Sequence, residues 1–167
     1  IYKINPDIFI VSQLFTDEIQ IQEPYLKLNF EGEEYAIDCY FNSDGKPVIL
    51  NILHHVFSSN SDVSDRIYST SKSIFEKHYN SILEFLKIIQ SKTNLKNFPA
   101  HIEVRIDSSE TINPIEVNPL RFGGWCTTGD LSWFAYGFNS YEYFIKSKVP
   151  NWSEIFKTRI DKKYSIV

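Results

Sequence analysis

Two neighbouring stretches of alternating apolar and polar residues, 100–107 and 112–118, constrain the fold of this chain most strongly. Alternation with a period of two is typical of a β-strand that buries one of its faces. The segment between them, Ser108–Thr111, is rich in turn-forming residues. We therefore expect a β-hairpin with one aliphatic face and one charged face.

The charged face of this hairpin brings acidic side chains together. If the turn is symmetric, so that the hairpin is centred between its second and third residues, Glu103 lies opposite Glu116 and His101 lies opposite Asn118. Directly opposed carboxylates repel each other, so something must offset the repulsion. A proton that raises one pKa would do so, as would a divalent cation held by oxygen ligands. A solvated face neutralised by Arg105 is the alternative.

The loop after the second strand adds a candidate anion-binding element, because Arg121 is followed by Gly123 and Gly124. Arginine forms bidentate, permanently charged contacts with phosphate oxygens. Glycines let backbone N–H groups come close to an anion. A glycine pair alone would indicate only a turn. Next to paired carboxylates, the combination favours a metal–nucleotide or acyl-phosphate site.

Three segments resemble the last strands of ATP-grasp ligases: His-Ile-Glu-Val-Arg at 101–105, Pro-Ile-Glu-Val-Asn-Pro at 114–119 and Arg-Phe-Gly-Gly at 121–124. The resemblance implies ATP and Mg²⁺ as cofactors. It implies that Glu103, Glu116 and Asn118 hold the metal against the phosphates, and that Arg121 is a catalytic residue. In the family an arginine commonly stands two residues after the metal-binding asparagine, whereas Leu120 occupies that position here.

A second resemblance lies upstream, where Gln22–Leu26 looks like the family's adenine hinge and Glu31–Tyr35 looks like the strand that follows it. It implies that the hinge hydrogen-bonds the adenine, with these candidate residues: Gln22, Glu23, Tyr25 and Leu26. It also implies that Glu34, or alternatively Glu33, binds the ribose hydroxyls. An ordinary acidic edge strand is the alternative for this segment.

Other polar residues are weaker candidates. Arg66 lies in a polar segment from which its guanidinium could reach the γ-phosphate or an acyl phosphate, and we treat it as a candidate catalytic residue; a salt bridge to a neighbouring aspartate is the alternative. His101 shares the face of the expected metal site and could orient a ligand. Asp130 could grip a substrate amine, or it could cap the helix that follows.

The remaining periodicities complete the expected fold. Strands over 33–41 and 47–53 flank the turn Asn42–Gly45 and predict another hairpin. The polar stretch 54–68 is typical of a loop. Helical spacing of apolar residues predicts helices over these ranges: 71–90, 131–138 and 141–148. The expected class is α+β, an antiparallel sheet with helices packed on one side.

The composition narrows the class of protein. A net charge of −4 argues against a broad nucleic-acid-binding surface. No apolar run reaches the length that spans a membrane. The two cysteines, Cys39 and Cys126, have no CxxC spacing, so we expect neither a zinc site built on them nor a redox pair, but a reduced, cytoplasmic protein.

We expect residues 1–167 to form one domain, the carboxyl-terminal part of an ATP-grasp domain. Because no glycine precedes Gln22, we expect the family's amino-terminal domain and phosphate-covering lid to be missing from the chain. The expected function is an ATP-dependent ligase that joins a small-molecule carboxylate to an amine or thiol through an acyl phosphate, with this chain carrying the Mg²⁺–ATP half of the site. The missing amino-terminal portion or another protomer is its expected partner. A non-catalytic nucleotide-binding or regulatory module is the alternative.

Overall fold

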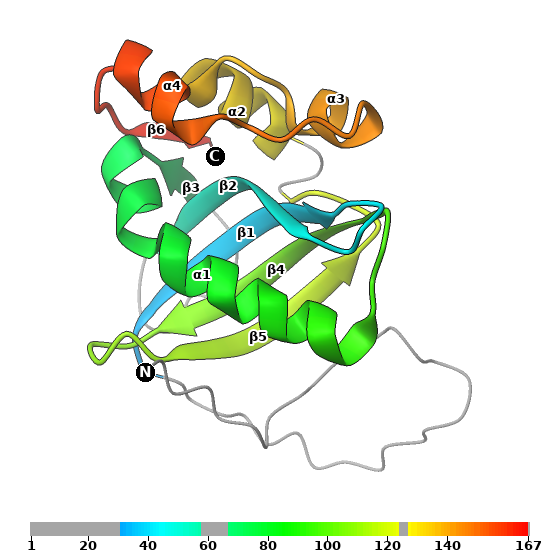
Figure 1. Ribbon diagram of the computed structural model, residues 1–167. Helices are drawn as coiled ribbons and strands as arrows, with labels where there is room; N and C mark the ends of the chain where they lie inside the picture. Colours follow the sequence, from blue (N-terminus) through cyan, green and yellow to red (C-terminus); the bar gives the residue numbers. More distant parts are fainter. Residues whose placement is uncertain (1–30, 58–66, 124–126, 167) are drawn as a thin grey trace.

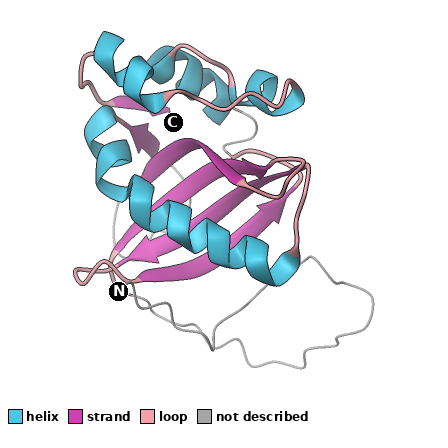
Figure 2. Ribbon diagram, in the orientation of Figure 1, coloured by secondary structure: helices cyan, strands magenta, loops and turns pink. Residues whose placement is uncertain are grey.

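The computed structural model describes residues 31–57, 67–123 and 127–166. In these residues one long helix, α1, crosses a face of an antiparallel sheet, and shorter helices gather on the side where β6 lies (Figures 1 and 2). The sheet has six strands in the order β5-β4-β1-β2-β3-β6. The strands are β1 (Glu33–Phe41), β2 (Pro47–Val56), β3 (Ile67–Thr70), β4 (Phe98–Ile106), β5 (Ile112–Pro119) and β6 (Tyr164–Ile166). The helices are α1 (Lys72–Thr93), α2 (Thr128–Tyr136), α3 (Ser140–Ile145) and α4 (Trp152–Thr158). The predicted α+β class is confirmed.

The hairpin of β4 and β5 has the predicted register at its charged face. Glu103 pairs with Glu116, and His101 pairs with Asn118. The two carboxylates are therefore direct cross-strand neighbours, as the alternation of the sequence predicts.

Nearer the turn, the register of this hairpin differs from the prediction by one residue. Ile106 pairs with Ile112, and a β-bulge in β5 separates this part of the ladder from the charged part. The turn is wider than expected because the Asp107 carboxylate accepts the backbone N–H groups of Ser109 and Thr111, at 2.8 and 3.0 Å. The extra residue in the bulge restores the predicted pairing further along the strands.

Strand β1 occupies the centre of the sheet and positions the side chains of its neighbours. It pairs with β2 on one side and with β4 on the other. The predicted turn to β2 is confirmed: the Asn42 side chain accepts the N–H groups of Asp44 and Lys46, each at 2.9 Å, and Gly45 has a φ of 82°. A left-handed φ of this size favours glycine.

Helix α1 is longer than predicted and covers the aliphatic face of the sheet. The Ser71 hydroxyl caps its first turn by accepting the N–H of Ile74 at 3.1 Å, and Asn94 ends it with a φ of 54°. The helix packs against strand residues that include Ile37, Ile52, Ile102, Val104 and Ile106. The other face of the sheet is therefore the one that carries the polar side chains of β1 and β4.

The prediction of a loop over 54–68 is wrong at both ends. Strand β2 continues through His55 to Val56, and β3 begins at Ile67; His55 pairs with Tyr68 across the two strands. The pairing of these strand ends could not be predicted from the polar sequence, because backbone hydrogen bonds between strands form without an alternation of apolar residues. Helix α4 and strand β6 were not predicted either.

Asp130 does not cap α2. The cap position is Thr127, and Asp130 lies in the first turn of the helix, where its negative charge interacts favourably with the helix dipole.

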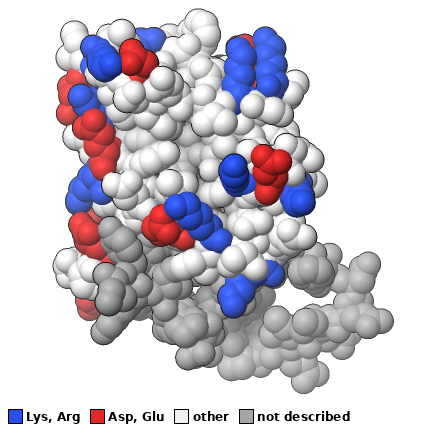
Figure 3. Space-filling view, viewed as in Figure 1, with Lys and Arg blue, Asp and Glu red and all other residues white. Residues whose placement is uncertain are grey.

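On the face of the molecule in Figure 3, acidic and basic side chains are interspersed. Among the described residues, no helix is both long enough and apolar enough to cross a membrane.

Candidate functional site

A buried histidine–aspartate pair lies at the centre of the polar face. Strand β1 places Asp38 opposite His101 of β4. The His101 Nδ1 lies 2.7 Å from Asp38 Oδ1, and neither residue is exposed to solvent. Each member of such a buried pair offsets part of the cost of desolvating the other, so removing one partner would leave an uncompensated buried group. The pair fixes the plane of the imidazole and directs Nε2 away from Asp38.

The other nitrogen of this ring faces Glu103. His101 Nε2 lies 3.4 Å from Glu103 Oε1, and Glu103 is only 8% exposed. Burial alone would lower the pKa of His101, but Asp38 and Glu103 outweigh it and raise that pKa to about 9. Burial acts to raise the pKa of Glu103, yet the interaction with His101 outweighs it and holds that pKa below its ordinary value. Glu103 is therefore a buried, negatively charged carboxylate whose oxygens can serve as metal ligands.

Glu116 behaves differently from Glu103, although the two are paired. It lies at the surface, and partial burial together with the charge of Glu103 raises its pKa. The charge of Arg121 opposes this shift in Glu116 and also lowers the pKa of Glu103. Arg121 is therefore close enough to act electrostatically on both carboxylates.

Two neighbours, an arginine and a histidine, hold the Glu34 side chain on the same face of the sheet. Arg105 donates to Glu34 Oε2 from Nε at 3.2 Å and from Nη2 at 3.0 Å. His55 Nδ1 lies 3.1 Å from Glu34 Oε1. Arg105 therefore balances the charge of Glu34, rather than that of Glu103 and Glu116 as the alternative to a metal site supposes. The Glu34 carboxylate has a defined orientation on the face that carries the other candidate ligands.

The loop after β5 is tied directly to the histidine–aspartate pair. The N–H of Gly123 donates to Asp38 Oδ1 at 3.0 Å, and Thr128 donates to the Gly123 carbonyl at 3.1 Å. A β-carbon on Gly123 would overlap the imidazole ring of His101. Glycine is thus required here for close packing on His101, and its position places Arg121 beside the carboxylates.

Five of the residues proposed from the sequence lie outside the described residues: Gln22, Glu23, Tyr25, Leu26 and Arg66. The remaining five lie on three strands and the loop after β5: Glu34, Glu103, Glu116, Asn118 and Arg121. Sequence reasoning missed Asp38 and His55. Asp38 alternates with the aliphatic residues of its strand and was a detectable signal, whereas His55 was read as part of a loop.

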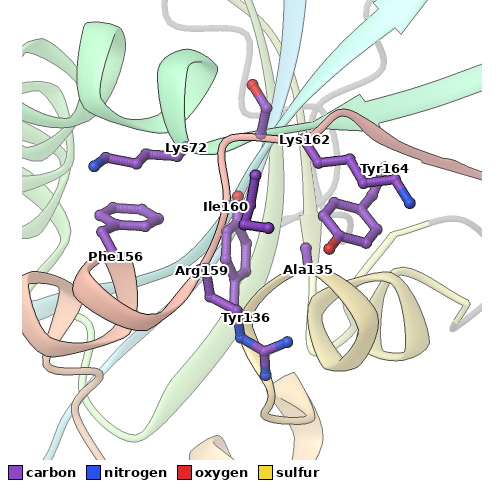
Figure 4. Close-up of a pocket in the computed structure, with 9 residues that line it drawn as sticks. Lys72, Ala135, Tyr136, Phe156, Arg159, Ile160, Lys162 and Tyr164 are labelled. Atoms are coloured by element: carbon purple, nitrogen blue, oxygen red, sulfur yellow. The ribbon is translucent and has the colours of Figure 1, made fainter.

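Two hollows in the described residues lie away from these side chains. One, of about 330 Å³, lies between α1 and the β1 and β4 strands, with Tyr35, His78 and Ile106 in its wall. The other, shown in Figure 4, lies among Lys72, Tyr136, Phe156 and Arg159, and its roughly 10 Å³ suits a single water molecule. Neither hollow is lined by the paired carboxylates. The candidate site is therefore identified from the arrangement of its side chains and not from a cavity.

The chain belongs to the ATP-grasp family: the family model described as an ATP-grasp domain matches residues 9–129. The fold is similar to an L-amino acid ligase from Bacillus licheniformis, with a TM-score of 0.60, 22% identity and 81% of this chain covered. It is also similar to the biotin carboxylase domain of the 2-oxoglutarate carboxylase of Hydrogenobacter thermophilus, solved with MgADP, ADP and bicarbonate, with a TM-score of 0.54, 10% identity and 80% of this chain covered. The chain spans 35% and 28% of the lengths of those two chains. None of the curated proteins matches it.

Proposed function

We propose that this chain carries the Mg²⁺–nucleotide half of the active site of an ATP-dependent ligase that joins a small-molecule carboxylate to an amine or thiol. The observation that supports the proposal most directly is the pairing of Glu103 with Glu116 on one face of the sheet. Membership of the ATP-grasp family and the likeness to an L-amino acid ligase support the same reaction class.

The residues present suit Mg²⁺. Glu103, Glu116 and the Asn118 amide together offer only oxygen ligands, which this ion prefers, and they leave room for phosphates and water. Bound there, Mg²⁺ would neutralise charge on the phosphates. Partial burial and the like charge of Glu103 raise the pKa of Glu116, and a cation between the carboxylates would relieve the repulsion between the two charges.

The chain's own side chains have separate roles in this proposal. Glu103 and Glu116 hold the metal, and Asn118 adds its amide oxygen. Arg121 binds the transferred phosphoryl group and stabilises its charge. Glu34, oriented by Arg105 and His55, accepts hydrogen bonds from the ribose hydroxyls.

In the proposed enzyme, which we expect to be cytoplasmic, other residues would bind the rest of the ATP molecule and complete the site. Gln22, Glu23, Tyr25 and Leu26 would meet the adenine, and Arg66 would meet the phosphate. An amino-terminal portion of the same protein, or another protomer, would supply the phosphate-covering groups. The acyl phosphate of the donor carboxylate would then react with the amine or thiol.

The substitution Glu116→Gln tests the metal assignment in the whole protein. We expect it to abolish ATP turnover while circular dichroism shows an unchanged fold. Glu110→Gln is a matched control, because Glu110 is an exposed residue in the turn of the same hairpin, and it should turn over ATP at the unmodified rate. Unchanged turnover in the Glu116 variant would remove the metal assignment. Nucleotide binding without turnover in the unmodified protein would favour the non-catalytic module.

A further inference from the structure

Three side chains from two strands form a cluster whose chemistry differs from that of the Mg²⁺ ligands. His55, His101 and Glu103 are all buried, and one possible ligand atom from each lies within 4.8 Å of the other two. The cluster spans β2 and β4, with β1 between them. Ala36 of β1, a fully buried residue with a short side chain, pairs with Glu103.

Each imidazole of the cluster has its Nδ1 next to a carboxylate. His101 Nδ1 lies 2.7 Å from Asp38, and His55 Nδ1 lies 3.1 Å from Glu34. A carboxylate on one ring nitrogen is the usual partner of a histidine that ligates a metal through the other nitrogen, because it fixes the ring and raises its basicity. Both histidines of the cluster have this carboxylate partner, and both have a ligand atom within 4.8 Å of a Glu103 oxygen.

We propose that His55, His101 and Glu103 form a site for a borderline-soft divalent cation, with Zn²⁺ as its best occupant. Imidazole nitrogen suits zinc, whereas Mg²⁺ prefers oxygen. Two histidines and one carboxylate form a known zinc ligand set that leaves a fourth position for water.

The geometry of the best-defined pair fits this cation. His101 Nε2 and Glu103 Oε1 are 3.4 Å apart. Two ligands at about 2.0–2.1 Å from a tetrahedral zinc are separated by roughly 3.3–3.4 Å. The pair therefore has a suitable separation. The third ligand atom, from His55, lies within 4.8 Å of the other two and would have to move closer to bind the same ion. Glu103 remains 8% exposed, which gives the cation a way in.

The site has a regulatory consequence that rests on the proposed function. Glu103 belongs both to this cluster and to the proposed Mg²⁺ ligands, so one carboxylate cannot serve both ions fully. Zn²⁺ should therefore weaken the binding of Mg²⁺–nucleotide, and Mg²⁺–nucleotide should weaken the binding of Zn²⁺ by the same factor.

The test measures Zn²⁺ alone, by titration against a chromophoric chelator, in the unmodified chain and in matched variants. His55→Gln should lower zinc affinity at least about tenfold. His54→Gln is the matched control, because His54 is the adjacent histidine and contacts Glu33 and Tyr35 instead of the cluster; its affinity should stay within about twofold of the unmodified chain.

Two further measurements separate the zinc site from the Mg²⁺ site. Glu103→Gln should lower zinc affinity as His55→Gln does, which also covers the case in which the histidine variant does not fold. Glu116→Gln should keep zinc affinity while losing Mg²⁺-dependent ADP binding. Co²⁺ in place of zinc should give the strong visible absorption of a four-coordinate site, and His55→Gln should lose it.

The proposal fails if folded His55→Gln and Glu103→Gln bind zinc as the unmodified chain does. It also fails if the unmodified chain binds no zinc, in which case the cluster only orients Glu103. If Glu116→Gln instead keeps Mg²⁺-dependent ADP binding, that result counts against the proposed function and leaves the zinc result standing.

Discussion

The substitution Asp38→Asn tests the electrostatics at the centre of the polar face. Asparagine keeps the shape of the side chain and an acceptor for the Gly123 N–H, but it removes the charge next to His101. The pKa of His101 is raised from 6.5 to about 9 in the folded chain. Each pKa unit corresponds to about 1.4 kcal/mol, so the bound proton contributes roughly 3 kcal/mol of stability at low pH.

The sign of this contribution sets its pH dependence. A group whose pKa is raised by folding stabilises the folded state fully below its unfolded pKa, and the contribution is lost as pH rises through its folded pKa. The window therefore runs from 6.5 to about 9. At pH 7 about 2.5 kcal/mol of this contribution should remain, and at pH 9.5 only about 0.2 kcal/mol.

Urea unfolding in the absence of metal measures this effect. At pH 7, Asp38→Asn should lower the free energy of unfolding by about 2 kcal/mol, somewhat less than the full amount because Glu103 still attracts the imidazolium; the urea midpoint should fall by roughly 1 M. The difference between the two proteins should change by about 2 kcal/mol between pH 7 and pH 9.5, because the contribution of the bound proton is lost over that range. Asp44→Asn, in an exposed turn, is the control. A difference that stays constant from pH 6.5 to 9.5 would refute the reasoning.

Three other perturbations have defined outcomes. Gly123→Ala drives a methyl group into the His101 ring, so thermal unfolding should show a loss of about 1–3 kcal/mol, and a melting curve that matches the unmodified chain would contradict the packing. Glu116→Gln removes a like charge opposite Glu103, so without metal it should raise stability by at most about 0.5 kcal/mol, and added Mg²⁺–nucleotide should stabilise only the unmodified chain; a destabilised variant would count against repulsion between the two glutamates. Ser71→Ala removes the cap of α1 and should lower the melting temperature by about 2–4 °C in a scan, whereas Ser71→Asn should retain most of the stability.

The β4–β5 hairpin shows which features of a strand pair can be predicted from the local sequence. Alternation assigned Glu103 and Glu116 to the polar face, and their pairing is confirmed. The predicted register was wrong near the turn, because the Asp107 carboxylate accepts hydrogen bonds that widen the turn. A bulge in β5 compensates for the extra residue. Both effects depend on hydrogen bonds that periodicity does not contain.

The sequence by itself determined the two hairpins, helix α1 and the faces on which the charged residues lie, because each of these depends on residues close together in the chain. Only the tertiary structure decided that β1 lies between β2 and β4. That order brings Asp38 to His101 across 63 positions and Glu34 to Arg105 across 71. It also places His55, at the end of β2 that the sequence did not predict, within reach of Glu103. Strand order is settled by burial summed over the whole sheet, and for that reason the surroundings of each carboxylate could not be predicted from the spacing of residues along the chain.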